Sequence, residues 1–361
     1  MKIITFIVVL FFCCQTLFSQ KVTPFIDFNN YFENFHKGTF NIVDLQLAKE
    51  FKAGDDCVAY MDFRDNLVVF DGETKKNLAN FKVNYQVSDH LIGWRIGQTI
   101  NMWDNGELRT LTYNGDTNYV VKDSIIVFAD LRYNSMKVYW NHDVYTLYSV
   151  VDDLYKPAFI GENIVAFKDN GNFYKVFWNG KIYDIGIWNN DIVFNGGTDV
   201  LAFNDPTTRT FTVFDQGEFV EVESFYMNNY KAGRGFVVYE DLNNNLNLYK
   251  NGEKNKISNF SSSKWEVKDE VILWVENNFL KTFYKNEAKS ICNFVPQSYL
   301  LKNNVIAYRN VMGGVNAFID GVNYEITNQQ ESDFEIYGSS VLVEMFNKSF
   351  VVLHNGTKFS K

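Results

Sequence analysis

The chain has 361 residues with a formal net charge of −9, and 46% of its residues are hydrophobic and 17% aromatic. An acidic chain without a run of basic residues is not expected to bind nucleic acid or an anionic membrane surface. No Ser/Gly-rich or charge-block segment interrupts the sequence. We therefore expect one domain over residues 21–361.

Residues 1–20 have the pattern of a secretory signal peptide, with Lys2 before an apolar stretch over residues 3–12 and a cleavage zone at residues 17–20. The apolar stretch is too short for a membrane span, and no second hydrophobic segment follows. The sequence therefore predicts an exported protein, periplasmic or extracellular, with no transmembrane segment in the mature chain.

The cysteines bear on this prediction. Cys13 and Cys14 leave lipidation as an alternative, although Phe11 and Phe12 before them fit a lipobox poorly. After cleavage only Cys57 and Cys292 remain, and they occupy different positions of the repeat described below. We interpret them as two separate core thiols, with a disulfide as the alternative.

One sequence unit returns about every 35 residues, and its clearest copy spans residues 51–78. Its centre is a short apolar triplet, bounded by turn-forming residues, which indicates a buried strand. The triplet recurs at residues 58–60, 92–94, 126–128, 165–167, 201–203, 237–239, 272–274, 306–308 and 342–344.

An alternating stretch follows each triplet and ends in a dipeptide such as Asp71-Gly72 or Asn105-Gly106. Dipeptides of this kind close two-residue type I′ hairpins, because both central residues need a positive φ. The slot recurs with Gly at Lys37-Gly38, Asn179-Gly180, Gln216-Gly217, Asn251-Gly252, Asp320-Gly321 and Asn355-Gly356, and without Gly at His142-Asp143 and Asn286-Glu287.

Each copy therefore contains four short strands, here named A to D in chain order, while residues 25–43 align with B, C and D alone. A four-stranded unit of this length cannot bury both of its faces, so it stacks on its neighbours, and radial stacking produces a β-propeller. The repeat resembles that of bacterial β-propellers with degenerate repeats. We predict an all-β propeller of four-stranded blades in a large ring of 8–10 repeats; an all-β sandwich or a pair of barrels is the alternative.

An acidic residue usually stands two positions after the triplet, in the predicted B–C turn. An acidic ring of this kind would bind a cation or a basic partner, whereas the alternative is that each residue stabilises its own turn through backbone hydrogen bonds. Carboxylates on successive blades lie too far apart to share one cation. The residues are Asp62, Asp130, Asp169, Asp205, Asp241 and Glu276, with Asn310 in the same slot.

Departures from the repeat indicate further candidates, because local rules tend to fail where function intervenes. Arg95 and Ile96 replace the usual acidic residue after the triplet 92–94. Arg234 enters a predicted A–B turn with Lys231 nearby, and Trp188 precedes the long segment 189–199. Segments 131–135 and 206–209 lengthen two B–C turns, and loops on a rigid scaffold often carry binding sites. The predicted ligand- or partner-binding residues are Asp62, Arg95, Asp130, Asp169, Trp188, Asp205, Arg209 and Asp241.

No HExxH, CxxC, nucleophile-elbow, phosphate-loop or dinucleotide motif is present. We therefore predict no metal, no cofactor and no catalytic residue. The predicted function is that of an exported, non-catalytic binding or scaffold protein of the cell envelope with a protein or glycan partner. The alternative is a polysaccharide hydrolase or lyase with an acid–base pair in the central channel.

Overall fold

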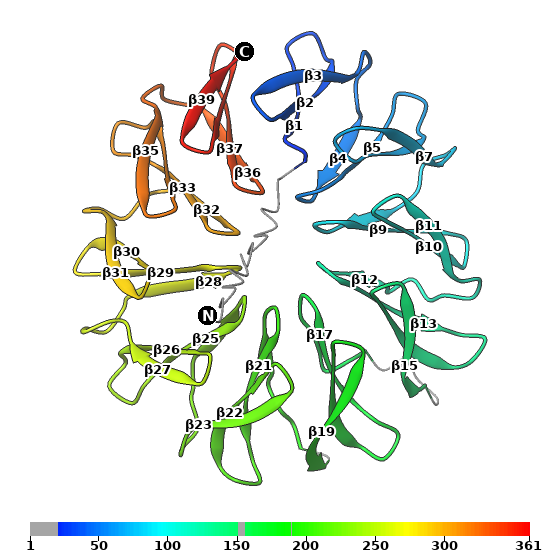
Figure 1. Cartoon of the computed structure of the whole chain (residues 1–361), viewed down its shortest axis with the longest axis vertical. Helices are drawn as coiled ribbons and strands as arrows, with labels where there is room; N and C mark the ends of the chain where they lie inside the picture. Colours follow the sequence, from blue (N-terminus) through cyan, green and yellow to red (C-terminus); the bar gives the residue numbers. More distant parts are fainter. Residues whose placement is uncertain (1–20, 151–155, 189) are drawn as a thin grey trace, which may run out of the picture.

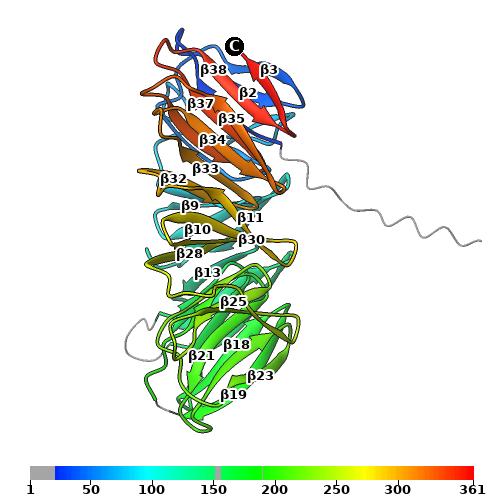
Figure 2. The same cartoon turned by 90° about the vertical axis from the view of Figure 1, so that its left-hand side faces the viewer.

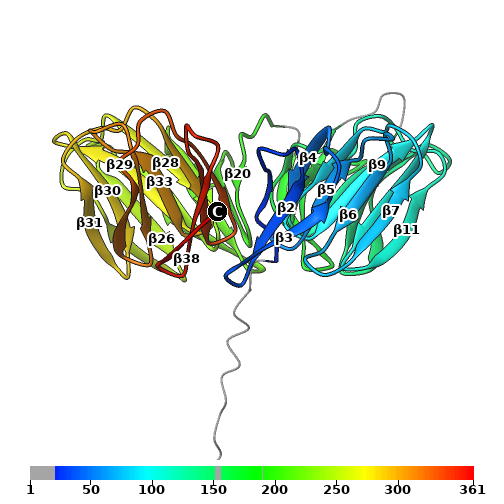
Figure 3. The same ribbon diagram turned by 90° about the horizontal axis from the view of Figure 1, so that it is seen from above.

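The computed structural model describes residues 21–150, 156–188 and 190–361 as ten antiparallel sheets arranged around a central axis (Figure 1). Nine sheets have four strands and one has three, and the described residues contain no helix. Seen from the side, the ring is a disc whose strands are inclined to the axis (Figures 2 and 3). The predicted all-β propeller with a large ring is confirmed.

The blades follow one another in chain order, and strand A of each four-stranded blade lies nearest the axis (Figure 1). The first five blades consist of the following strands: blade 1, β1 (Pro24–Ile26), β2 (Phe32–His36) and β3 (Thr39–Asp44); blade 2, β4 (Glu50–Ala53), β5 (Val58–Met61), β6 (Leu67–Phe70) and β7 (Lys75–Ala79); blade 3, β8 (Tyr85–Val87), β9 (Leu91–Ile96), β10 (Thr99–Asp104) and β11 (Glu107–Thr112); blade 4, β12 (Val120–Val121), β13 (Ile125–Asp130), β14 (Ser135–Trp140) and β15 (Asp143–Ser149); blade 5, β16 (Phe159–Ile160), β17 (Ile164–Lys168), β18 (Phe173–Trp178) and β19 (Lys181–Trp188).

The other five blades all have four strands. They are blade 6, β20 (Asn195–Gly196), β21 (Val200–Asp205), β22 (Thr210–Asp215) and β23 (Glu218–Glu223); blade 7, β24 (Tyr230–Gly233), β25 (Phe236–Glu240), β26 (Leu246–Lys250) and β27 (Glu253–Lys256); blade 8, β28 (Lys264–Lys268), β29 (Val271–Glu276), β30 (Phe279–Tyr284) and β31 (Glu287–Cys292); blade 9, β32 (Tyr299–Lys302), β33 (Val305–Arg309), β34 (Val315–Ile319) and β35 (Val322–Thr327); blade 10, β36 (Asp333–Tyr337), β37 (Ser340–Glu344), β38 (Phe350–His354) and β39 (Thr357–Ser360).

The apolar triplets form the B strands and are buried on both faces. Alternate residues of a B strand point to opposite faces of its sheet, so one strand packs against two neighbouring blades. In blade 6, Leu201 and Phe203 contact the cluster of blade 5, while Val200 and Ala202 join the cluster shared with blade 7. Successive blades are therefore held together by burial of the same short strands.

The C–D turns confirm most of the predicted type I′ hairpins, since both residues of Asn105-Gly106 and of the six corresponding Gly-containing dipeptides have positive φ. In blade 2 the prediction is wrong, because the connection between β6 and β7 has four residues and Asp71 accepts hydrogen bonds from the backbone N–H groups of Glu73 and Thr74. In blades 4 and 8 the turn falls one residue earlier than predicted, at Asn141-His142 and Lys285-Asn286.

The ring closes between blades 10 and 1 by side-chain packing, because blade 1 has no strand A and blade 10 has all four of its own strands. The rings of Phe25 and Phe350 lie 4.5 Å apart between their centroids. The ring centroids of Phe35 and Phe359 lie 5.1 Å apart. Lys361 forms an ion pair with the buried Glu33. Blades 1 and 10 thus lie side by side (Figure 1).

Cys57 and Cys292 are both free thiols, as the interpretation of two separate thiols predicts. Cys57 is buried at the start of strand B in blade 2, and burial raises the pKa of its thiol.

We expect Phe350→Ala to destabilise the ring at its closure. Phe350 is 4% exposed, so its truncation should lower the free energy of unfolding by about 3–5 kcal/mol. The matched control is Phe346→Ala, since Phe346 is 70% exposed in the same blade and should change stability by no more than about 0.5 kcal/mol. Denaturant unfolding followed by tryptophan fluorescence measures the free energy of unfolding of both variants. An equal decrease in the two variants would contradict closure of the ring by this packing.

Candidate functional site

The acidic residues predicted to form a ring lie in or beside the B–C turns, and most of them bond to their own turn. The carboxylate of Asp62 accepts hydrogen bonds from the backbone N–H groups of Arg64 and Asn66, both at 2.8 Å. The same arrangement with the following backbone recurs at Asp130, Asp169, Asp205 and Asp241. This geometry agrees with the turn-forming interpretation, and a role in binding stays a prediction.

The ionisation of these carboxylates follows from the same bonds. Partial burial raises the pKa of Asp62 and Asp241, but the hydrogen bonds from their own turns outweigh it and bring both pKa values below the ordinary value. Asp130 also forms an ion pair with Lys137 at 2.7 Å. The carboxylates are therefore occupied by neighbours in sequence.

The three remaining predicted site residues lie in three different blades. Arg95 is half-buried in β9 of blade 3. Arg209 is exposed in the B–C turn of blade 6, where its φ is 61°. Trp188 ends β19 of blade 5, and 57% of its side chain is exposed. Its exposure, rather than core packing, makes Trp188 available for contact with a partner.

The two faces of the disc differ in polarity. Because strands alternate in direction, the B–C turns and the D–A connections lie on one face, here named the BC face, and the A–B and C–D turns lie on the opposite face, the AB face. Of the 26 large hydrophobic residues exposed in the described part of the chain, 19 lie on the BC face and none lies in an A–B or C–D turn. The other seven lie within A or D strands.

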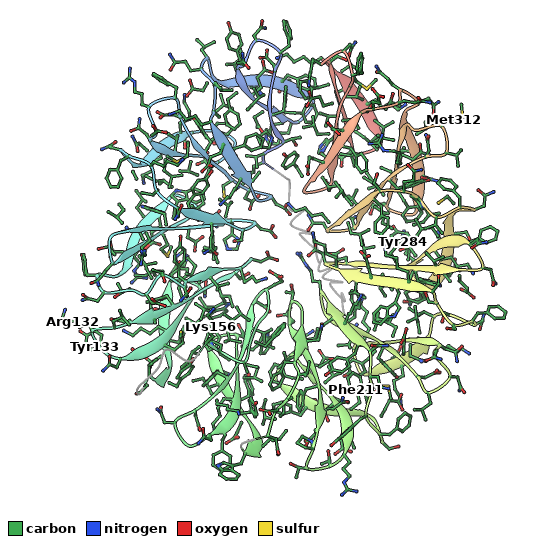
Figure 4. The ribbon with its side chains drawn as sticks, turned by 180° about the vertical axis from the view of Figure 1, so that it is seen from behind. Arg132, Tyr133, Lys156, Phe211, Tyr284 and Met312 are labelled. Atoms are coloured by element: carbon green, nitrogen blue, oxygen red, sulfur yellow. The ribbon has the colours of Figure 1, made fainter. Side chains whose placement is uncertain are left out.

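Every blade contributes to this apolar set, so exposed apolar side chains occur on the BC face around the whole ring. Figure 4 labels two members, Tyr133 of blade 4 and Met312 of blade 9, at widely separated points of the rim. The set comprises Phe28, Leu45, Leu47, Phe63, Phe81, Tyr113, Leu131, Tyr133, Phe173, Trp188, Val193, Tyr226, Leu242, Phe260, Phe279, Val295, Val311, Met312 and Phe346.

A pocket of about 620 Å³ lies between blades 6, 7 and 8. Its walls come largely from D–A connections and from the first residues of A strands, which belong to the BC face. Sequence reasoning singled out the segment 189–199, which supplies Val193 and Asn195, and Lys231. It did not predict the pocket, because the other lining residues come from three successive repeats and follow the repeat pattern.

The A–B turns meet at the axis on the AB face, where cations bridge blades that are not neighbours. The guanidinium of Arg234 in blade 7 lies 4.0 Å from the carboxylate of Asp89 in blade 3 and 3.8 Å from that of Asp123 in blade 4. Lys302 in blade 9 lies 2.9 Å from Asp55 in blade 2. We name these five residues the axial cluster. Arg234 is one of the departures from the repeat that the sequence reveals.

Two carboxylates of the axial cluster, Asp89 and Asp123, are hard to ionise. Burial raises the pKa of Asp89 and Asp123 above the ordinary carboxyl value, and the neighbouring carboxylates add to this effect. Arg234 acts in the opposite direction and lowers both pKa values. In the described residues, no group of three or more His, Cys, Asp or Glu side chains could hold a metal ion.

The fold and the ring of ten blades define a β-propeller of unusual size. The chain belongs to the family of the 10-bladed beta propeller domain, whose family model matches residues 16–359. No curated protein matches the chain. Among the described residues, no helix is long and apolar enough to cross a membrane.

Several solved structures are similar to this chain at low identity. A eukaryotic initiation factor is 12% identical with a TM-score of 0.46, over 85% of this chain and 96% of that chain. The computationally designed Ika8 protein is 13% identical with a TM-score of 0.35, over 74% and 94%. Hsv2 of Kluyveromyces lactis is 12% identical with a TM-score of 0.29, over 64% and 94%. Likeness at this level implies neither a shared partner nor a shared activity.

We expect Arg234→Gln to destabilise the protein in a pH-dependent way. Carboxyl groups with a raised pKa in the folded state contribute stability that is full below the unfolded pKa and is lost as pH rises through the folded pKa. Without the guanidinium to pair with the ionised carboxylates, the stability lost at high pH should be larger. The free energy of unfolding of the variant should therefore fall by about 1–2 kcal/mol at pH 8 and by less at pH 5.

Thermal unfolding at the two pH values measures this effect. Arg209→Gln is the matched control, because Arg209 is exposed in a turn and its replacement should change stability by less than about 0.5 kcal/mol at both pH values. Equal destabilisation of Arg234→Gln at pH 5 and pH 8 would show that its effect is packing rather than charge.

Proposed function

We propose that the protein is an exported, non-catalytic binding protein of the cell envelope that docks on another protein through its BC face. The observation that carries the proposal is the segregation of exposed apolar side chains to one face of the disc. Large exposed apolar areas on a soluble protein are typical of interaction surfaces. The partner is macromolecular, because the apolar residues are distributed over all ten blades.

Charge favours a protein partner over a membrane. The chain has a formal net charge of −9, and anionic lipid surfaces attract basic rather than acidic proteins. The carboxylates of the BC face accept hydrogen bonds from their own turns, so the exposed apolar side chains between them are the groups free to be buried by a partner. A broad apolar protein surface suits this arrangement.

The alternative function, a polysaccharide hydrolase or lyase, would require an acid and a base on facing blades with substrate between them. The carboxylates that meet at the axis contact Arg234 and Lys302 instead. The binding function therefore accounts for more of the observed geometry.

Docking through the BC face predicts that Leu242→Glu combined with Phe346→Glu abolishes partner binding. Both side chains are at least 70% exposed on this face, so the charges should prevent burial of the face without unfolding the protein. The control combines Ile182→Glu with Val322→Glu, which lie exposed on outer D strands.

Mild cross-linking and capture of the tagged mature protein from native envelope fractions provides the measurement. A stoichiometric protein partner should be retained by the wild type and the control and should fall at least about tenfold in the BC-face variant. Equal capture by all three proteins would exclude docking through this face. Cosedimentation of the purified protein with anionic or zwitterionic vesicles would favour a membrane instead.

Export predicts that the mature chain begins near Lys21. Residues 1–20 lie outside the described residues, and the expectation depends on their sequence alone. Intact-mass spectrometry of the protein from the periplasmic or extracellular fraction should show loss of about 20 residues. Full-length protein in the cytosol would contradict export, and a mass increment of a lipid at Cys13 or Cys14 would support the lipoprotein alternative.

A further inference from the structure

The pocket between blades 6, 7 and 8 has rigid walls. Asn204 fixes the D–A connection of blade 7, since its side-chain amide donates to the carbonyl of Met227 at 2.8 Å and its oxygen accepts the Met227 N–H at 3.0 Å. The oxygen of Asn195 accepts the N–H of Ala232 at 2.8 Å. These bonds join residues from different blades, so the pocket is preformed rather than assembled by a ligand.

The charged side chains of the pocket are all engaged by neighbouring groups. Both oxygens of Glu240 are occupied, one by the indole N–H of Trp265 at 2.7 Å and the other by the amide of Asn229 at 2.6 Å. Lys231 donates to the carbonyl of Trp265 at 2.9 Å and lies over its ring. Lys264 lies 3.4 Å from Glu266, which is outside the lining. Lys231 and Lys264 balance Glu240 and Glu266 in formal charge, so these four residues offer a charged ligand no net counter-charge.

The groups left over are neutral. In the described part of the chain, the side chains of Asn228 and Ser263 have no hydrogen-bond partner, and both line the pocket. The side-chain NH₂ group of Asn195 likewise has no hydrogen-bond partner among the described residues. Amides and hydroxyls can both donate and accept hydrogen bonds. They therefore suit a ligand whose own groups both donate and accept.

Apolar surface lies beside these neutral groups. Val193, Tyr230 and Trp265 line the same pocket, and Val193 is 76% exposed. A pyranose presents hydroxyl groups around its edge and C–H groups on its faces, so it matches both kinds of wall. The volume of about 620 Å³ lies in the range of small-ligand pockets.

We propose that this pocket binds a neutral saccharide of one or two sugar rings. A charged sugar would meet no net charge of opposite sign here. A purely apolar ligand would cover the exposed Asn228 and Ser263 and remove their water without replacing its hydrogen bonds, which disfavours it. The site goes beyond the proposed docking on a protein, because it needs neither the partner nor the apolar residues on the other blades.

Isothermal titration calorimetry with the purified mature protein tests the proposal. The probes are maltose, cellobiose, lactose and N,N′-diacetylchitobiose, with glucuronic acid and a neutral tetrapeptide as comparisons. We expect at least one disaccharide to bind and neither comparison compound to do so. Binding of none of the four disaccharides, or tighter binding of glucuronic acid or the peptide, would overturn the proposal.

A double variant, Asn228→Ala with Ser263→Ala, shows whether binding occurs in this pocket. Neither side chain supports the walls, so the variant should fold as the wild type and lose affinity at least about tenfold. The matched control is Asn243→Ala, an exposed residue in the B–C turn of blade 7 outside the pocket lining, which should bind as the wild type does. Unchanged affinity in the double variant would place binding elsewhere and overturn the assignment.

The outcome is independent of the docking experiment. Leu242→Glu combined with Phe346→Glu changes residues outside the pocket lining, so this variant should keep saccharide affinity while it loses the protein partner. Failure of docking with intact saccharide binding, or the reverse, would separate the two proposals.

Discussion

The structure depends on burial of one short apolar strand between two neighbours. A B strand such as residues 200–205 has its alternate side chains in two different inter-blade cores, so no blade can satisfy both of its faces alone. This constraint forces the sheets into a closed series. It also explains why ring closure needs no shared sheet: Phe25 and Phe350 repeat across the last gap the burial that every other pair of blades uses.

Closure of the ring has a chemical consequence at each end of the axis of the disc. On the AB face, the A–B turns of distant blades meet, and their charges must be paired: Arg234 and Lys302 reach carboxylates on blades three or four positions away. On the BC face, the B–C turns and the D–A connections also carry apolar residues that the inter-blade cores do not bury, and these remain exposed. The same repeat thus produces one face whose charged residues pair with one another across the axis and another face whose apolar residues are available to a partner.

The propeller is a rigid support for both proposed sites, but the two sites depend on different parts of it. Docking on a protein uses residues from all ten blades and depends on their placement on one face of the ring. The pocket uses three successive blades and depends on local amide bonds, such as those between Asn204 and Met227. Binding energy is not spent on ordering either site, because the inter-blade cores already fix the strands that carry them.

The sequence by itself determined the strands, the repeat and the ring, because hydrophobic alternation and positive-φ dipeptides such as Asn105-Gly106 are local properties of the chain. It also identified blade 1 as incomplete and Arg234 as a departure from the repeat. It did not determine that Asp62 and its equivalents would be occupied by their own turns, since their spacing was compatible with either role. Only the tertiary structure decided that Arg234 lies opposite Asp89 and Asp123, because closure of the ring brings these distant repeats together. It also decided that the exposed apolar residues share one face and that Asn195, Asn228 and Ser263 line one pocket, because both depend on how different repeats are placed relative to one another.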